Sequence, residues 1–138
     1  MKLAIAGAVL LALVLPSAAA AHATLLRSEP ASGATLATAP RVVTLVFDDV
    51  VHVGPGVAAV RNGDGSVLGG HARTHGRVET IPLRPGLEDG VYTVRWSVVS
   101  DDGHLVEGVV PFRIGSGGPV EAALAAGGPD RTADVVAR

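Results

Sequence analysis

The histidines are the side chains of this chain best suited to chemistry, because it has no cysteine and one methionine, Met1. His22 follows a run of alanines, so cleavage before it would give the residue a free α-amine beside its imidazole. Both nitrogens donate to metals when deprotonated, and an α-amine pKa of about 8 makes this accessible near neutral pH. Such a pair suits Cu(II), which favours a tetragonal set of nitrogen and oxygen ligands. The alternative is that a histidine starts the mature chain by chance.

A second group of ligand types lies in the segment Ser100–His104, with sequence Ser-Asp-Asp-Gly-His. Asp102 and His104 are two positions apart, so in an extended chain both side chains point to the same face. Their carboxylate oxygen and imidazole nitrogen, joined by the two nitrogens of His22, would complete a plane of four donors around one metal ion. The alternative is an acidic turn with a solvated histidine, because the motif is short.

Three further histidines have weaker claims to a function. His52 follows Asp48-Asp49 in a predicted loop, while His71 and His75 lie between glycines with no evident third ligand. We expect solvated loop side chains at His71 and His75, with a metal role for this pair as the alternative. His52 could lie near either end of the domain. Most of the paired carboxylates, at 48/49, 88/89 and 101/102, are expected to serve turns and solubility.

Composition and motifs exclude several classes of function. A net charge of −2 argues against a nucleic-acid partner, and four aromatic residues leave little for base stacking or sugar binding. No G-x-S-x-G elbow, P-loop or dinucleotide-binding glycine motif is present. We therefore expect a binding protein and not an enzyme.

The N-terminus has the pattern of a secretory signal peptide covering residues 1–21. A positive start is followed by the apolar stretch Leu3–Leu15 and by alanines up to Ala21, which form an A-x-A cleavage site. A membrane anchor is the alternative, but the stretch is too short to span a bilayer. The mature chain, residues 22–138, has ten arginines and thirteen acidic residues. Export to an oxidising compartment without cysteine means that its core must hold without disulfides.

The remainder is predicted to be an all-β domain over residues 22–115. Apolar and β-branched runs bounded by Gly, Pro and Asn-Gly turns predict short strands at 24–27, 41–47, 57–61, 78–83, 90–100 and 107–114. In the clearest strand, alternation places Tyr92, Val94, Trp96 and Val98 on one face. We expect an antiparallel sandwich or barrel. Residues 116–138, rich in Ala and Gly, are expected to be a flexible tail.

Three segments together resemble the CopC family of bacterial copper-resistance proteins. They are the start of the mature chain at His22–Gly33, the strand Arg41–Asp49, and Gly90–His104 followed by Gly108 and Phe112. The resemblance covers about residues 22–115. It implies a Greek-key, immunoglobulin-like β-sandwich that binds one Cu(II) in the periplasm or an equivalent extracytoplasmic space.

The resemblance also implies the copper ligands. These are His22, through amine and imidazole, together with Asp102 and His104. Asp49 matches an acid that lies near the family's site, although Asp replaces the usual Glu, so we expect it to support the ligands without binding copper. The methionine-rich loop of some members has no counterpart, because 57–78 contains no methionine. We therefore expect no thioether Cu(I) site.

The leading expectation is a monomeric copper carrier or scavenger in copper resistance or homeostasis. A membrane copper transporter of the CopD type, which often occurs with the family, is the partner that the resemblance implies. One alternative is a copper monooxygenase with an N-terminal histidine brace, which Asp102 and the few aromatic residues argue against. Another is an immunoglobulin-like interaction module that binds no metal.

Overall fold

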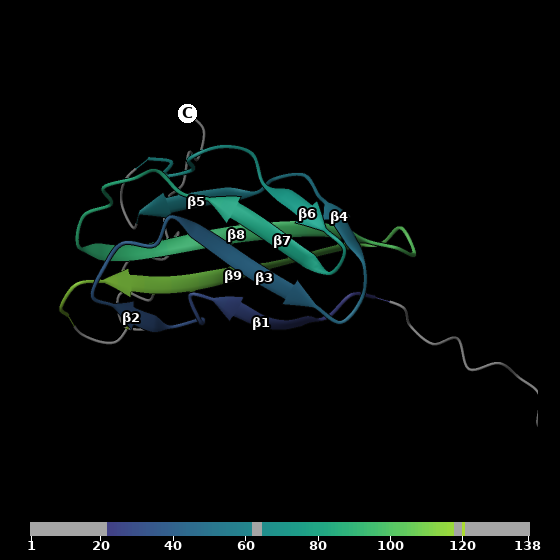
Figure 1. Ribbon diagram of the computed structural model, residues 1–138, viewed down its shortest axis with the longest axis horizontal. Coiled ribbons are helices and arrows are strands. Elements are labelled where there is room, and N and C mark those ends of the chain that lie inside the picture. Colours follow the sequence, from purple (N-terminus) through teal and green to yellow (C-terminus); the bar gives the residue numbers. More distant parts are fainter. Residues whose placement is uncertain (1–21, 62–64, 118–119, 121–138) are drawn as a thin grey trace, which may run out of the picture.

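Nine strands form two sheets in the part of the chain that the computed structural model describes, which is residues 22–61, 65–117 and 120. They are β1 (Leu25–Glu29), β2 (Ala34–Leu36), β3 (Val42–Phe47), β4 (Val51–Val53), β5 (Ala58–Arg61), β6 (Arg73–His75), β7 (Val78–Pro82), β8 (Gly90–Ser100) and β9 (Leu105–Ile114). Figure 1 shows the two sheets packed face to face. The predicted all-β sandwich is confirmed.

The sheets differ in size and in the direction of one strand. The first has the order β1-β3-β7-β6, and the second has the order β2-β9-β8-β4, with β5 also pairing with β8. All neighbours are antiparallel except β2 and β9, which run parallel. This parallel pair involves β2, a strand that was not predicted from the sequence, and the other pairings are antiparallel as expected. The long hairpin β8–β9 lies behind β3 and β7 in Figure 1 and forms the centre of the second sheet.

Alternation along the strands places the core where the sequence predicts it. The four predicted inward residues of β8 are at most 5% exposed, and so are the alternate residues of β9 and β3 that face them. These residues are Tyr92, Val94, Trp96 and Val98 in β8, Val110, Phe112 and Ile114 in β9, and Val43, Leu45 and Phe47 in β3. The contact across the sheets includes an edge-to-face pair of Phe47 and Trp96, with ring centroids 5.4 Å apart.

Gly108 explains how the single tryptophan fits into this core. It lies directly opposite Trp96 in the β8–β9 pairing, and a Cβ at this position would collide with the indole ring. The ring therefore lies against the bare backbone of β9. This close approach is the physical reason for a glycine in the middle of β9.

The structure corrects several local predictions. The three-residue strands β2, β4 and β6 were not predicted, and β9 begins two residues earlier than expected. His52 was predicted in a loop but lies in β4, and His75 lies in β6. Runs of three residues are too short to show a period, and these strands are defined by their pairing with longer neighbours.

Some predictions fall where the structure describes little. The predicted signal peptide at 1–21 and all of the predicted tail except residues 116, 117 and 120 lie outside the described residues. Within the described ranges, no helix has the length and apolar character needed to cross a membrane.

Candidate metal centre

The turn between β8 and β9 carries two of the three predicted ligands. The hairpin is paired down to Val99 and Leu105, and the turn is closed by a hydrogen bond from the Ser100 amide to the His104 carbonyl of 2.9 Å. Gly103 has φ of 86°, a left-handed conformation that glycine adopts most readily. Asp102 and His104 therefore come together through a tight turn, and not through the extended chain on which the sequence argument relied.

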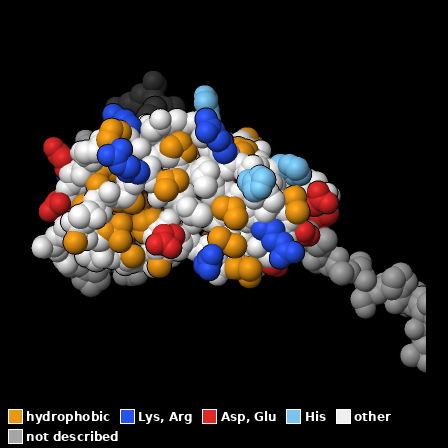
Figure 2. Space-filling model, in the orientation of Figure 1, with side chains coloured by type: hydrophobic (Ala, Val, Ile, Leu, Met, Phe, Trp, Pro, Cys, Tyr) orange, Lys and Arg blue, Asp and Glu red, His pale blue; other side chains and the backbone are white. Residues whose placement is uncertain are grey.

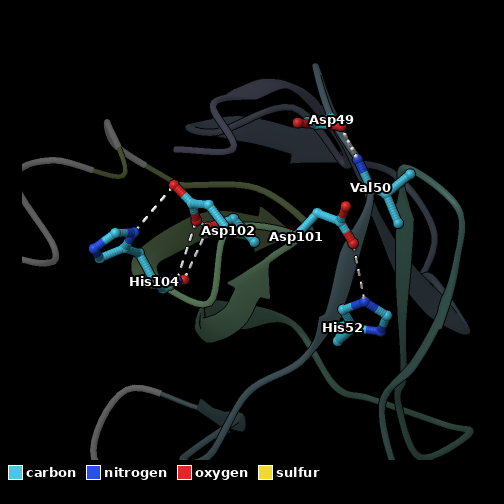
Figure 3. Close-up of polar contacts among 7 residues, drawn as sticks. Asp49, Val50, His52, Asp101, Asp102 and His104 are labelled. Atoms are coloured by element: carbon cyan, nitrogen blue, oxygen red, sulfur yellow. Dashed lines mark hydrogen bonds and ion pairs between the residues drawn. The ribbon is translucent and has the colours of Figure 1, made fainter. Parts of the chain in front are cut away.

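Asp102 is held by three contacts within this turn. Its Oδ1 accepts hydrogen bonds from the buried Ser100 hydroxyl and, at 3.2 Å, from the His104 amide. Its Oδ2 lies 3.0 Å from His104 Nδ1, as Figure 3 shows. The Ser100 hydrogen bond is the largest cause that lowers the pKa of Asp102 to about 2, and the contacts with His104 add to it. The carboxylate is therefore ionised and oriented at neutral pH.

His22 reaches the same place from the start of the first sheet. Ala23, next to it, is only 2% exposed and packs in the core. Thr24 donates its amide to Asp48 Oδ1 at 2.6 Å and accepts the Asp48 amide at 3.0 Å. The Thr24 amide lowers the pKa of Asp48, which stays ionised at neutral pH. These contacts fix the chain just after His22 and direct it towards the hairpin turn.

The three predicted ligands converge. The imidazole rings of His22 and His104 have centroids 4.5 Å apart. One ligand atom each from His22, Asp102 and His104 lies within 4.8 Å of the others, and all three residues are exposed. Nitrogen and oxygen ligands bind one ion at about 2.0–2.2 Å, so small side-chain rotations would bring all three atoms onto a single ion.

The other candidates lie elsewhere. Asp49 is not in this group, and its Oδ1 accepts the Val50 amide at 2.7 Å, the contact drawn in Figure 3. His71 lies in the segment before β6, and His75 lies within β6 at the edge of the first sheet. His52 faces Asp101, with Nε2 and Oδ1 3.7 Å apart.

Sequence reasoning missed two residues that support the centre, Asp48 and Ser100. Asp48 anchors the segment after His22, although the sequence argument had singled out its neighbour Asp49. Ser100 orients Asp102 from the buried end of β8. Ser100 stands in the segment Ser100–His104 that the sequence singles out, but its hydrogen bond to the Asp102 side chain depends on the path of the turn.

Replacing Ser100 by alanine is expected to raise the pKa of Asp102 from about 2 towards its ordinary value of 3.8, because the strongest hydrogen bond to its carboxylate is lost. The measurement is a carbon NMR titration of the Asp102 carboxyl in metal-free protein. Ser97→Ala, on the opposite face of β8, is the matched control and should leave this pKa unchanged. Equal pKa values in Ser100→Ala and the unchanged protein would contradict the assignment.

Comparison with known proteins places this geometry in a family. The family model described as CopC domain matches residues 25–115. Copper transport protein CutJ of Bacillus subtilis is 33% identical over 105 residues, which are 73% of this chain and 19% of CutJ, so the chain spans about a fifth of that protein. Protein YobA of Escherichia coli K12 is 35% identical over 98 residues, 68% of this chain and 79% of YobA.

Solved structures agree with this match. The crystal structure of CopC from Methylosinus trichosporium OB3b has a TM-score of 0.59 and 28% identity, covering 67% of this chain and 93% of that one. PcoC, a methionine-rich copper resistance protein from Escherichia coli, has a TM-score of 0.56 and 24% identity, covering 69% of this chain and 100% of PcoC, and supports the fold alone. From the matched residues, the relatives and the shared sandwich, we conclude that this chain belongs to the CopC family.

Proposed function

We propose that this chain is an exported Cu(II) carrier or scavenger that binds one ion through His22, Asp102 and His104. The observation that carries the proposal is the convergence of these three side chains, from the chain start and the β8–β9 turn, to within 4.8 Å. Cleavage before His22 would add the α-amine as a fourth donor. Two imidazoles, an amine and a carboxylate form the nitrogen and oxygen set that Cu(II) favours.

The chain's own residues have distinct roles in holding the ion. His22 and His104 would supply imidazole nitrogens, and Asp102 would supply a carboxylate oxygen already ionised at neutral pH. Ser100 and Asp48 position these ligands from the buried strand end and from the start of β1. Supporting contacts of this kind typically change metal affinity by 10–100-fold.

Carriage of copper fits this donor set better than catalysis. Four protein donors in one plane would fill the equatorial positions of a tetragonal Cu(II) ion, and a substrate could then approach only along the weaker axial direction. The mature chain contains no sulfur, so no thioether or thiolate is available to favour Cu(I). The name of CutJ, a copper transport protein, supports copper as the cargo. We also propose a role in copper resistance or homeostasis, in the periplasm or an equivalent space and with a CopD-type membrane transporter as partner. Membership of the CopC family and the predicted signal peptide support this role.

The test is a Cu(II) titration of two forms of the protein, one starting at His22 and one with a single extra alanine before it. The form starting at His22 should bind one equivalent tightly. The extended form should bind at least about 100-fold more weakly, because loss of a direct ligand costs more than loss of a supporting contact. Equal Cu(II) affinities of the two forms would show that the α-amine is not a ligand. Oxidised sugar products in the presence of a reductant would instead favour a monooxygenase.

A further inference from the structure

Beside the candidate centre, two side chains that it does not use face one another. His52 lies in β4, and Asp101 is the first residue of the turn after β8. His52 Nε2 and Asp101 Oδ1 are 3.7 Å apart. Figure 3 shows Asp101 between His52 on one side and the pair of Asp102 and His104 on the other.

Strand pairing holds the His52–Asp101 pair in place. In the second sheet, β4 lies beside β8 with His52 opposite Val99 and Val51 opposite Ser100. Asp101 follows Ser100 directly, at the end of that register. The imidazole therefore projects from β4 and the carboxylate from the turn that follows β8, so the pairing of β4 with β8 brings the two backbone positions side by side.

The donor atoms of His52 and Asp101 are available to bind an ion. A separation of 3.7 Å is too long for a hydrogen bond. The two side chains are 64% and 70% exposed, and within the described residues neither side chain has another hydrogen-bonding or ionic partner. An imidazole nitrogen and a carboxylate oxygen that bind one ion at about 2.0–2.2 Å lie roughly 3–4 Å apart, which is the spacing found here.

The surroundings attract cations. Asp48, Asp49, Asp101 and Asp102 all lie in the two loops at this end of the sandwich. Figure 2 shows acidic side chains beside histidines at this end, with Lys or Arg side chains also close by, and Arg77 acts on Asp48. Clustered charges of one sign raise the local concentration of ions of the opposite sign. Such a field does not select a metal, but the imidazole of His52 favours copper over the hard cations Mg²⁺ and Ca²⁺.

We propose that His52 and Asp101 form a second, weaker Cu(II) site, with water completing the coordination. That the bound ion is copper rests on the proposed function, whereas the site itself shares no ligand with the candidate centre. Because Asp101 adjoins Asp102 in the chain, an ion held by this pair lies next to the centre of His22, Asp102 and His104. The pair would serve as the place where copper enters or leaves that centre.

The experiment is equilibrium dialysis of the protein starting at His22 against Cu(II), continued past one equivalent. The unchanged protein should show a tight first step and a second step that is weaker by several orders of magnitude. His52→Ala should weaken the second step at least 10-fold and leave the first step unchanged. Because an exposed ion pair contributes little to folding, this variant should keep its fold.

His71→Ala is the matched control, since it removes a histidine that belongs to neither site. It should leave both steps unchanged, and Asp101→Asn should reproduce the effect of His52→Ala on the second step. A second step that is absent, or that responds equally to His52→Ala and His71→Ala, would overturn the second site. If the unchanged protein shows no tight first step, the proposed function is overturned instead. Failure of the second site and failure of the proposed function are therefore distinguishable.

Discussion

His104→Ala is expected to lower the affinity for Cu(II) by at least about 100-fold, because it removes an imidazole ligand from the proposed centre. The same change removes the ring nitrogen that lies 3.0 Å from Asp102 Oδ2, so the remaining carboxylate is less well oriented. The backbone hydrogen bonds that close the turn do not depend on this side chain. The affinity is measured by competition with a chelator of known strength.

His75→Ala is the matched control for this loss. His75 lies in β6, at the edge of the first sheet, and has no place in the group of His22, Asp102 and His104. Its replacement should leave the first Cu(II) equivalent bound as tightly as before. If His104→Ala and His75→Ala bind Cu(II) equally well, the ion is not held at the β8–β9 turn.

Glu79→Gln is expected to stabilise the protein at alkaline pH and to flatten the pH dependence of its stability. Glu79 points into the core from β7 and is fully buried, and neither of its carboxylate oxygens has a hydrogen-bond partner among the described residues. Burial raises its pKa from 4.5 to about 7. The folded state therefore binds this proton more tightly than the unfolded state does.

The direction of the pH effect follows from this difference. The contribution of Glu79 is most favourable below pH 4.5 and is lost as the pH rises through about 7. The shift corresponds to about 3 kcal/mol of unfolding free energy between these limits. Glutamine has no proton to lose, so Glu79→Gln should lack this decrease. Urea unfolding at pH 5 and pH 8 measures it.

Glu107→Gln provides the matched control, since Glu107 is exposed on β9. It should leave the pH dependence of unfolding as it is in the unchanged protein. If Glu79→Gln and Glu107→Gln lose equal unfolding free energy between pH 5 and pH 8, the buried Glu79 carboxyl does not cause the decrease.

Local patterns were enough to predict the six longer strands and the core of this fold. The run from Gly90 to Ser100 was predicted with its bounds and with its inward face, because the alternation from Tyr92 to Val98 gives a clear period. The short strands β2, β4 and β6 could not be predicted in this way, since pairing with neighbours distant in sequence defines them. The burial of Glu79 could be predicted from the sequence, because Glu79 is two residues from Ile81 and lies on the same strand face.

The metal centre was predictable as a set of residues but not as a geometry. Asp102 and His104 meet through the turn at Gly103, and His22 joins them through the pairing of β1 with β3. The sequence could not tell which of two adjacent acids, Asp48 or Asp49, would turn towards the chain start. That choice depends on the local path of the backbone after β3, which hydrogen bonds to Thr24 determine.

The most direct test of the proposed centre is pulsed electron paramagnetic resonance of the protein starting at His22 with one equivalent of Cu(II). Selective nitrogen-15 labelling of histidine distinguishes imidazole and His22 amine nitrogens from other nitrogens. We expect a single tetragonal Cu(II) species coupled to three nitrogens, two of them imidazole, with one imidazole coupling lost in His104→Ala. Coupling to a single nitrogen, or a spectrum that His104→Ala does not change, would contradict a Cu(II) centre made by His22, Asp102 and His104.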